Sequence, residues 1–306
     1  MSGADVIVVG GSFAGLSAAI YLARARRRVL VIDSGLPRNR FSAHSHGVLA
    51  LDGRPGSELL GAARAQLARY PTVTQIGGEV QRVVADDRSL SFEVHTTAGE
   101  RFVSRRLILA TGLVDQPPNV PGLPERWGKS VFHCPYCDGY EFGSGPLGVL
   151  ATGPLSVHFA TIVADWGATT LFTNQVIEVD EAERSRLARR GIRVEDGAVA
   201  ALEGSPEGGL DRIRLRGGGS VPARALFVAT LYRQGASLAR EMGCEIVEGP
   251  RGPLVKTDEG KLTSVPGVYA AGDMARPTHS IPFAVSDGAT AGTSAHQSLV
   301  AEEPPA

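Results

Sequence analysis

The octapeptide HCPYCDGY, residues 133–140, places two of the three cysteines of the chain, Cys134 and Cys137, at a spacing of three. A pair at this spacing can bind a metal, close a structural bridge or exchange electrons. A zinc site needs four ligands, and neither Cys244 nor the histidines supply a second pair at a suitable spacing. A purely structural bridge over so short a loop would restrict the unfolded chain little and would be unusual in a reducing compartment.

Electron exchange agrees best with the residues around the pair. Pro135 suits the first turn of a helix, which would put Cys134 near a helix N-terminus, where a thiolate is stabilised. Asp138 follows Cys137 directly and could move protons during the exchange. We therefore interpret the pair as redox-active, with Cys134, Cys137 and Asp138 as catalytic residues, and we expect no metal.

The beginning of the chain has the pattern of an element that binds a dinucleotide. The sequence ADVIVVGGSFAGLSAAIYLARARRRVLVID predicts a strand over Val6–Val9, a glycine-rich turn, a helix of small residues and a second strand that ends at Asp33. Gly10, Ser12 and Gly15 occupy the three glycine positions of G-x-G-x-x-G, where the turn and the helix N-terminus face a pyrophosphate. Asp33 stands where a carboxylate accepts hydrogen bonds from the adenosine ribose.

Two further motifs accompany this turn, LILATG at residues 107–112 and GVYAAGDM at residues 267–274. The three together resemble the fingerprint of the FAD-dependent pyridine-nucleotide-disulfide oxidoreductases. The resemblance implies that Asp273 holds the ribityl chain or the pyrophosphate of FAD. A helix predicted from about Phe283 would direct its N-terminus at the flavin pyrimidine and stabilise negative charge there.

The segment CPYCDG resembles the C-x-x-C-D-G redox site of the low-molecular-weight thioredoxin reductases, and the likeness extends from Asp5 to Ala295. It implies an α/β chain with two three-layer, Rossmann-like dinucleotide-binding domains, FAD as cofactor, and a homodimer. It also implies that Cys137 faces the flavin, that Cys134 exchanges with substrate, and that Asp138 is the acid/base. The cofactor-binding residues that the resemblance assigns are Gly10, Ser12, Ala14, Gly15, Asp33, Ser34, Arg40, His46, Val80, Ala110, Thr111, Gly112, Gly272, Asp273, Phe283 and Ala284.

These motifs predict a discontinuous FAD-binding domain, residues 1–115 and 235–306. Residues 116–234 are predicted to form a degenerate NAD(P)H-binding-like domain that carries the cysteine pair. The proline-rich segment QPPNVPGLP, residues 116–124, is interpreted as the outgoing hinge and LYRQG, residues 231–235, as the return.

The predicted NAD(P)H turn departs from the reductase pattern. Ala151, Gly153 and Ser156 stand where G-x-G-x-x-A is expected, so the first glycine is missing. Residues 173–175, TNQ, stand where the reductases present basic side chains to a 2′-phosphate. Loss of nicotinamide binding is the favoured interpretation, with a degenerate but functional site as the alternative.

Two relatives of the reductases share this erosion. One group contains dithiol oxidases of the gliotoxin and holomycin type, and the other contains thioredoxin reductases fed by ferredoxin or another flavin. The segment HSHGVLALDG, residues 44–53, resembles the flavin-side loop of the oxidases. We therefore predict a thiol oxidase that forms a disulfide in a small-molecule dithiol, with oxygen as acceptor. A reductase acting on a thioredoxin-like protein and a non-catalytic FAD-binding redox sensor remain alternatives.

The composition limits the other classes of partner. The chain has 306 residues, 43% of them hydrophobic and 21% charged, and a formal net charge of -1. This balance gives no field that would attract nucleic acid. No apolar stretch reaches the ~18 residues of a membrane span, and no signal peptide is apparent, so we expect a cytoplasmic protein without a membrane partner.

Overall fold

The computed structural model describes residues 3–86 and 91–302. Contacts between residues divide the chain into two compact units. The first unit contains the described residues of Met1–Arg40, Gly56–Val114 and Tyr232–Ala306, and the second contains Phe41–Pro55 and Asp115–Leu231. None of the helices in the described ranges is long and apolar enough to cross a membrane.

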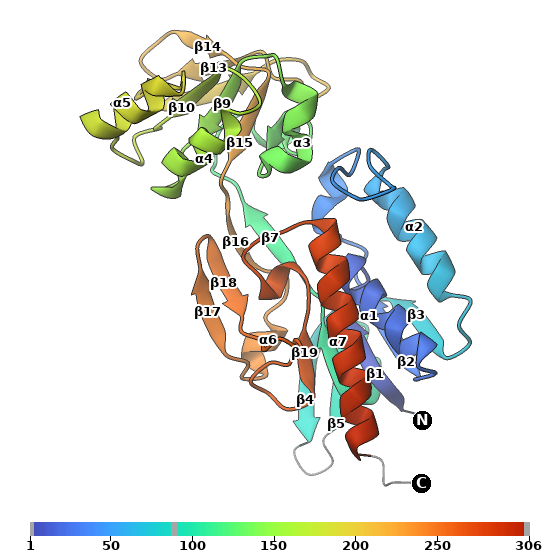
Figure 1. Cartoon of the computed structure of the whole chain (residues 1–306). Coiled ribbons are helices and arrows are strands. Elements are labelled where there is room, and N and C mark those ends of the chain that lie inside the picture. Colours follow the sequence, from blue (N-terminus) through green and yellow to red (C-terminus); the bar gives the residue numbers. More distant parts are fainter. Residues whose placement is uncertain (1–2, 87–90, 303–306) are drawn as a thin grey trace. The chain divides into compact units, whose positions relative to one another are not determined.

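The first unit is built on a mostly parallel sheet (Figure 1). Its described strands are ordered β3-β2-β1-β6-β5-β4, and β19 pairs with β6. The strands are β1 (Ala4–Val9), β2 (Val29–Asp33), β3 (Val73–Gly77), β4 (Val80–Asp86), β5 (Ser91–Thr96), β6 (Arg101–Leu109) and β19 (Val268–Ala270). The helices are α1 (Phe13–Arg24), η1 (Arg38–Phe41), α2 (Gly56–Leu67), α6 (Leu238–Glu241), η3 (Asp273–Ala275) and α7 (Ile281–Glu302).

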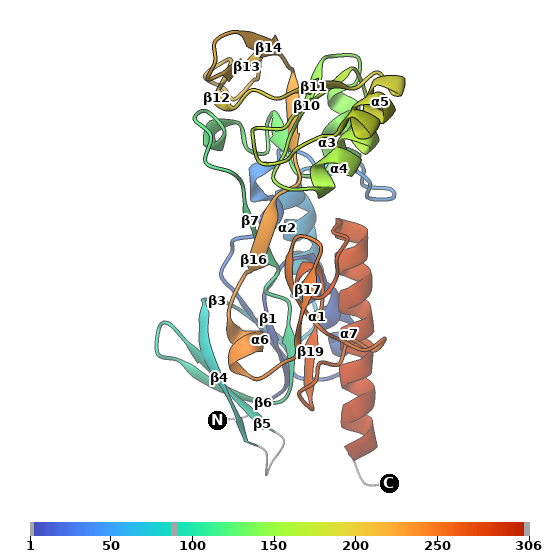
Figure 2. The same ribbon diagram turned by 90° about the vertical axis from the view of Figure 1, so that its left-hand side faces the viewer.

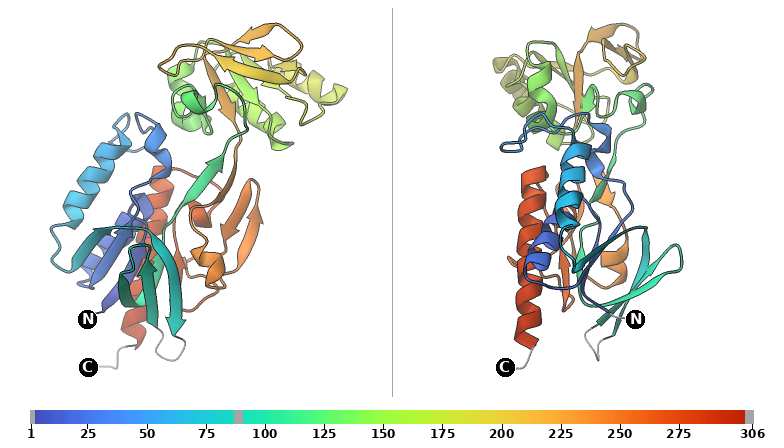
Figure 3. Two further views of the ribbon diagram at one scale, coloured as in Figure 1. Left: turned by 180° about the vertical axis from the view of Figure 1, so that it is seen from behind. Right: turned by 90° about the vertical axis from the view of Figure 1, so that its right-hand side faces the viewer.

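The long strand β6 joins two kinds of pairing. Its first half pairs antiparallel with β5, and its second half pairs in parallel with β1 and β19. Helices α1 and α7 lie side by side on one face of the parallel strands, as Figures 1 and 2 show. The antiparallel strands β4 and β5, teal in Figure 3, lie on the side away from α7. This arrangement makes three layers, as the sequence predicted.

Alternation along β1 explains why both faces of the sheet are covered. Val6 and Val8 pack into the core under α1 and α7, whereas Ile7 and Val9 pack into the opposite core with β5. All four side chains are buried, which is typical of a parallel strand covered on both faces. Burial of each stabilises the fold by roughly 1.5–3 kcal/mol before the entropy cost of ordering it.

The second unit repeats the architecture with a parallel sheet ordered β11-β10-β9-β15-β8 and an antiparallel sheet ordered β12-β13-β14. The strands are β8 (Val131–Phe132), β9 (Leu147–Leu150), β10 (Thr169–Phe172), β11 (Arg193–Glu195), β12 (Val199–Glu203), β13 (Arg212–Leu215), β14 (Ser220–Pro222) and β15 (Ala225–Val228). The helices are η2 (Pro124–Arg126), α3 (Pro135–Phe142), α4 (Leu155–Val163) and α5 (Glu181–Arg189). Two Rossmann-like units are therefore present, and the predicted fold class is confirmed.

Two paired strands carry the chain between the units. They are β7 (Leu113–Gln116) and β16 (Leu231–Gln234), and a hairpin of β17 (Ile246–Gly249) and β18 (Gly252–Val255) follows in the first unit. The observed divisions fall at residues 114/115 and 231/232. Residues 41–55 belong to the second unit by contact, although they precede most of the first unit in sequence. The assignment of one unit to FAD and the other to a lost nicotinamide site stays a prediction.

Candidate active site

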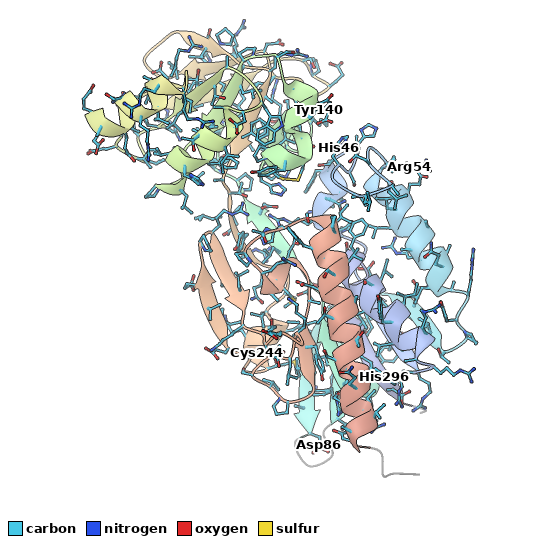
Figure 4. The ribbon with its side chains drawn as sticks, in the orientation of Figure 1. His46, Arg54, Asp86, Tyr140, Cys244 and His296 are labelled. Atoms are coloured by element: carbon cyan, nitrogen blue, oxygen red, sulfur yellow. A yellow bond between two sulfur atoms is a disulfide. The ribbon has the colours of Figure 1, made fainter. Side chains whose placement is uncertain are left out.

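The two motif cysteines form a disulfide at the start of α3. Their Cα atoms are 5.4 Å apart, and Figure 4 draws the sulfur–sulfur bond in yellow. Cys134 is the N-cap residue with extended backbone, and Pro135 occupies the first turn, as the sequence predicted. Proline is favoured there because its missing N–H would have no partner inside the helix. The helix N-terminus stabilises a thiolate at this position when the bond is reduced.

The glycine of the CDG sequence has a packing role. A Cβ atom on Gly139 would lie 3.0 Å from the ring of Trp166, so only glycine lets α3 approach this indole closely. Tyr136 also packs edge-to-face with Trp166, at 5.2 Å between ring centroids and 89° between planes. The redox helix is thereby held against the end of α4. The sequence gives no local sign of this contact, because Trp166 is distant in the chain.

Asp138 lies one residue after Cys137 and is largely buried. Burial, and secondarily the carboxylate of Glu141, raises the pKa of Asp138 from 3.8 to about 7, while His46 has the opposing effect. A carboxyl group with this pKa is protonated about half of the time near neutral pH, which suits a group that both donates and accepts a proton. A strongly perturbed pKa next to a redox pair supports a functional role for Asp138.

His46 comes from residues 41–55 and contacts the redox helix within the second unit. Its Nε2 lies 3.4 Å from Oε1 of Glu141, and its Nδ1 lies 3.7 Å from Oδ2 of Asp52. In the structure, His46 contacts these two carboxylates and joins residues 41–55 to α3, and its predicted role in cofactor binding stays a prediction.

The glycine turn after β1 forms a tight cradle in the first unit. Gly10 has a φ of 105°, and a Cβ atom there would lie 2.3 Å from the carbonyl oxygen of Ala110. A Cβ atom on Gly15 would lie 1.8 Å from the oxygen of Gly10, so the helix can start only with glycine at this position. Ser12 is the N-cap of α1, but its hydroxyl makes no capping hydrogen bond. The first N–H groups of α1 are thus left uncapped by Ser12, as a phosphate-binding helix requires.

Asp33 lies at the end of β2, beside the turn. Its Oδ1 accepts a hydrogen bond from the N–H of Gly11 at 3.0 Å, and its Oδ2 pairs with Arg64 at 2.9 Å. Gly11 and Arg64 were not predicted. The glycine directly after Gly10 was an available signal for the first, whereas nothing in the local pattern pointed to Arg64 on α2.

The second cofactor motif is organised by an arginine that the sequence analysis missed. Arg38, on η1, pairs with Asp273 at 2.8 Å, and its guanidinium lies 2.9 Å from Nδ1 of His279. Burial lowers the pKa of His279 from 6.5 to about 4, so the imidazole is neutral near pH 7. Since Arg38 can only donate, Nδ1 accepts, and Nε2 donates to the carbonyl oxygen of Arg276 at 2.9 Å.

The remaining predicted cofactor residues lie in the first unit at the ends of its elements. Thr111 donates weakly to the sulfur of Met274, 3.5 Å away, which links two of the motifs. Helix α7 begins at Ile281, two residues before the predicted start at Phe283, and Phe283 stacks under the guanidinium of Arg276 at 4.2 Å. The others are Ala14 and Ala284 against the helical core, Ser34 after β2, Arg40 on η1, Val80 at the start of β4, and Ala110, Gly112 and Gly272 in the turns after β6 and β19.

These residues fit FAD. The uncapped start of α1 can accept a pyrophosphate, and Asp33 lies where a ribose is expected. The turn after β1 has no room for a side chain at Gly10. The corresponding turn of the second unit lies between β9 and α4. There the N–H of Thr152 donates to the buried Oγ of Ser156 at 3.0 Å, and Oδ1 of Asn174 accepts from the N–H of Val199 at 2.8 Å. The N–H of Thr152 and the amide oxygen of Asn174 are thus bonded within the protein, and the loss of nicotinamide binding in this unit stays a prediction.

Cys244 takes no part in either site. It is buried beside Thr263, with 3.5 Å between its sulfur and the hydroxyl, and burial raises the pKa of its thiol. Across residues 3–86 and 91–302, no three His, Cys, Asp or Glu side chains gather in a way that could hold a metal ion.

Comparison with known proteins gives consistent matches along almost the whole chain. Residues 4–288 match the pyridine nucleotide-disulphide oxidoreductase family. The thioredoxin reductase tcpT of Claviceps purpurea is 34% identical, and the alignment covers 97% of this chain and 95% of that protein. An oxidoreductase from Agrobacterium tumefaciens has a solved structure with 42% identity and a TM-score of 0.93, covering 98% and 100% of the two chains. The crystal structure of HlmI matches with 38% identity and a TM-score of 0.92, covering 98% and 93%.

Proposed function

The chain belongs to the pyridine nucleotide-disulphide oxidoreductase family, and from that premise we propose that it oxidises a small-molecule dithiol to a disulfide, with oxygen as the final acceptor. The chain is an FAD-dependent disulfide oxidoreductase with thioredoxin reductase-like relatives. The direction of electron flow and the oxygen step are the parts that we propose.

One observation carries the proposal, namely the turn between β9 and α4, which has Ala151 in place of the first glycine and an N–H on Thr152 that is already bonded. A nicotinamide dinucleotide needs free backbone N–H groups at such a turn. Ser156 takes the N–H of Thr152, and the Thr152 hydroxyl itself donates to the carbonyl oxygen of Ala229 at 2.7 Å. Residues 173–176 offer no cation for a 2′-phosphate. We infer that electrons enter from a thiol substrate instead of a reduced nicotinamide.

The chemistry of the cysteine pair balances without a nicotinamide. A substrate thiolate attacks Sγ of Cys134, the bond to Cys137 breaks, and Cys137 leaves as a thiolate. The second thiolate of the substrate attacks the mixed disulfide, so that the substrate departs as a disulfide and both enzyme sulfurs are reduced. When bound, FAD supplies the acceptor that reoxidises the pair and delivers the two electrons and two protons to oxygen as hydrogen peroxide.

Asp138 is the proton carrier in this scheme. With a pKa of about 7 it can protonate the departing thiolate of Cys137 and later take that proton back. Its position one residue after Cys137, at the start of α3, supports this role. An ordinary aspartate, almost fully ionised at neutral pH, would make a poor donor.

A reductase remains the second candidate because of the names of the relatives. Proteins from Claviceps purpurea and Leptosphaeria maculans that are 34% and 29% identical are both named thioredoxin reductases. In that case the same sulfurs would reduce the disulfide of a thioredoxin-like protein. The electrons would then have to come from NAD(P)H, ferredoxin or another flavin.

An anaerobic titration separates the two functions. The FAD-loaded protein is mixed with dithiothreitol, NADPH or NADH while the visible absorbance of the flavin is recorded. We expect bleaching by the dithiol alone, followed by recovery and stoichiometric peroxide when oxygen is admitted. Stoichiometric bleaching by NADPH or NADH would overturn the oxidase in favour of the reductase.

The Cys137→Ser variant is the matched control for this titration. It should keep the yellow colour of bound FAD and lose dithiol turnover, because the pair can no longer close. Normal turnover by this variant would contradict the assignment of the redox pair.

A further inference from the structure

The redox helix exposes two large aromatic side chains beside the cysteines. Tyr136 is 74% exposed and Tyr140 is 86% exposed. They are four positions apart on α3, so they share one face of the helix, and Tyr136 lies between Cys134 and Cys137 in sequence. Neither ring is needed to fill the core, and exposed apolar groups clustered at a reactive site mark a binding surface.

Packing against Trp166 fixes the position of Tyr136 on this face of the helix. Trp166 packs edge-to-face with Tyr136, at 5.2 Å between ring centroids, and contacts the helix at Gly139. A stacking surface that is already ordered loses little conformational entropy when a ligand binds, which favours affinity. The ring of Tyr136 is therefore arranged before any substrate arrives.

Residues 41–55, in the same unit, also expose large apolar side chains. Leu49 is 95% exposed and Leu51 is 43% exposed. The contact of 3.4 Å between His46 and Glu141 joins this segment to α3, and Figure 4 shows His46 near Tyr140. Residues 41–55, which expose these two leucines, are thus joined to the redox helix within the second unit.

The charges on the helix are acidic. Along its eight residues α3 carries Asp138 and Glu141 and no cation. Figure 4 shows Arg54, the single arginine of residues 41–55, well apart from Tyr140. An anionic substrate would be repelled by Glu141, which is partly exposed, whereas a neutral or cationic one would not.

We propose that Tyr136 and Tyr140 contact the apolar body of the dithiol substrate, and that Glu141 selects against dithiols carrying a negative charge. This inference rests on the proposed function. The reaction is the one given above, in which the two thiols of the substrate become a disulfide, the pair is reduced, and oxygen accepts the two electrons as peroxide. Tyr136 and Tyr140 are specificity residues in it and transfer no electrons.

Two matched pairs of dithiols test the proposal. Dithiothreitol and 1,2-benzenedimethanethiol close disulfide rings of the same size but differ in the polarity of the body. Dihydrolipoamide and dihydrolipoate differ only in charge. We expect Tyr140→Ala to lower kcat/KM for the benzene dithiol by about three- to tenfold, the range of one aromatic contact, and to leave dithiothreitol within about twofold.

Conservative and control variants complete the design. Tyr140→Phe should behave as the parent, because the ring and not the hydroxyl makes the contact. Glu141→Gln should narrow the preference for dihydrolipoamide over dihydrolipoate by about twofold or more. Tyr21→Ala removes a half-exposed tyrosine from α1 of the first unit, and it should leave the ratio of kcat/KM values within each pair of dithiols unchanged. Flavin absorbance and the thermal unfolding midpoint verify folding of each variant.

The outcomes distinguish this inference from the proposed function. If Tyr140→Ala lowered kcat/KM equally for dithiothreitol and the benzene dithiol, the role of the aromatic surface would be refuted while the proposed oxidase activity would stand. A selective loss with reduced thioredoxin as the substrate would also refute that role, because it would assign the surface to a protein. If the parent turned over no dithiol at all, the proposed function would fail and this inference with it.

Discussion

Replacement of Asp138 by asparagine should stabilise the protein at high pH. The pKa of this carboxyl rises from 3.8 to about 7 on folding. Below about pH 4 the group is protonated in both the folded and the unfolded chain, so it contributes nothing to the pH dependence of the free energy of unfolding. Between about pH 4 and pH 7 the folded chain keeps a proton that the unfolded chain has lost, so the free energy of unfolding falls as the pH rises.

The size of this effect follows from the two pKa values. At about 1.4 kcal/mol for each pH decade, the loss of stability reaches about 4 kcal/mol above pH 7. Asparagine has almost the same shape and stays neutral, so Asp138→Asn should escape this loss. The variant should match the parent near pH 4 and exceed it by up to about 4 kcal/mol near pH 8. It should also lose about 10²-fold or more of its dithiol turnover, because asparagine moves no proton.

The assay is urea or thermal unfolding of the FAD-loaded proteins across this pH range. Asp165→Asn, which changes a carboxylate of the same unit that is 69% exposed, serves as the control and should show no comparable divergence. If the difference between Asp138→Asn and the parent were the same at low and high pH, the buried carboxyl could not have the raised pKa. The account of Asp138 as a proton carrier would then have to be abandoned.

Three further outcomes can be checked. Gly10→Ala should abolish FAD binding and destabilise the chain, because the new Cβ would lie 2.3 Å from the oxygen of Ala110; retention of the flavin on gel filtration would contradict the cradle. Arg38→Met should leave the partly buried carboxylate of Asp273 without its cation and lower the free energy of unfolding by roughly 3–5 kcal/mol. The thermal unfolding midpoint should fall, and fluorescence titration should show weaker FAD binding. Cys244→Ala should keep full turnover, because this thiol is buried apart from both sites, and a large loss would reveal an unrecognised role.

Local patterns were sufficient for the elements that carry chemistry. The apolar run before Gly10 and the small residues after it predicted β1 and α1, and Pro135 predicted the start of the redox helix at Cys134. Each of these features depends on neighbours in sequence, on strand and helix periodicity or on the fixed φ of proline. The start of α7 was misplaced by two residues for the same reason, since helix ends depend on weak local preferences.

The residues that were missed all act through contacts distant in sequence. Arg38 meets Asp273 across 235 positions, and Arg64 meets Asp33 across 31. No periodicity encodes such pairs. The raised pKa of Asp138 is similar, because it depends on burial and on Glu141, neither of which can be read from the sequence CDG.

The first unit also has a particular order of completion during synthesis. Its parallel sheet needs β19, and its helical layer needs α7, whose Gly288 approaches α1 so closely that a Cβ atom would lie 2.1 Å from the oxygen of Ala14. Both elements emerge from the ribosome after the whole second unit, which ends at Leu231. The unit that carries the disulfide can therefore be complete while the edge of β6 still lacks β19, and flavin can be acquired only after β19 and α7 have been made.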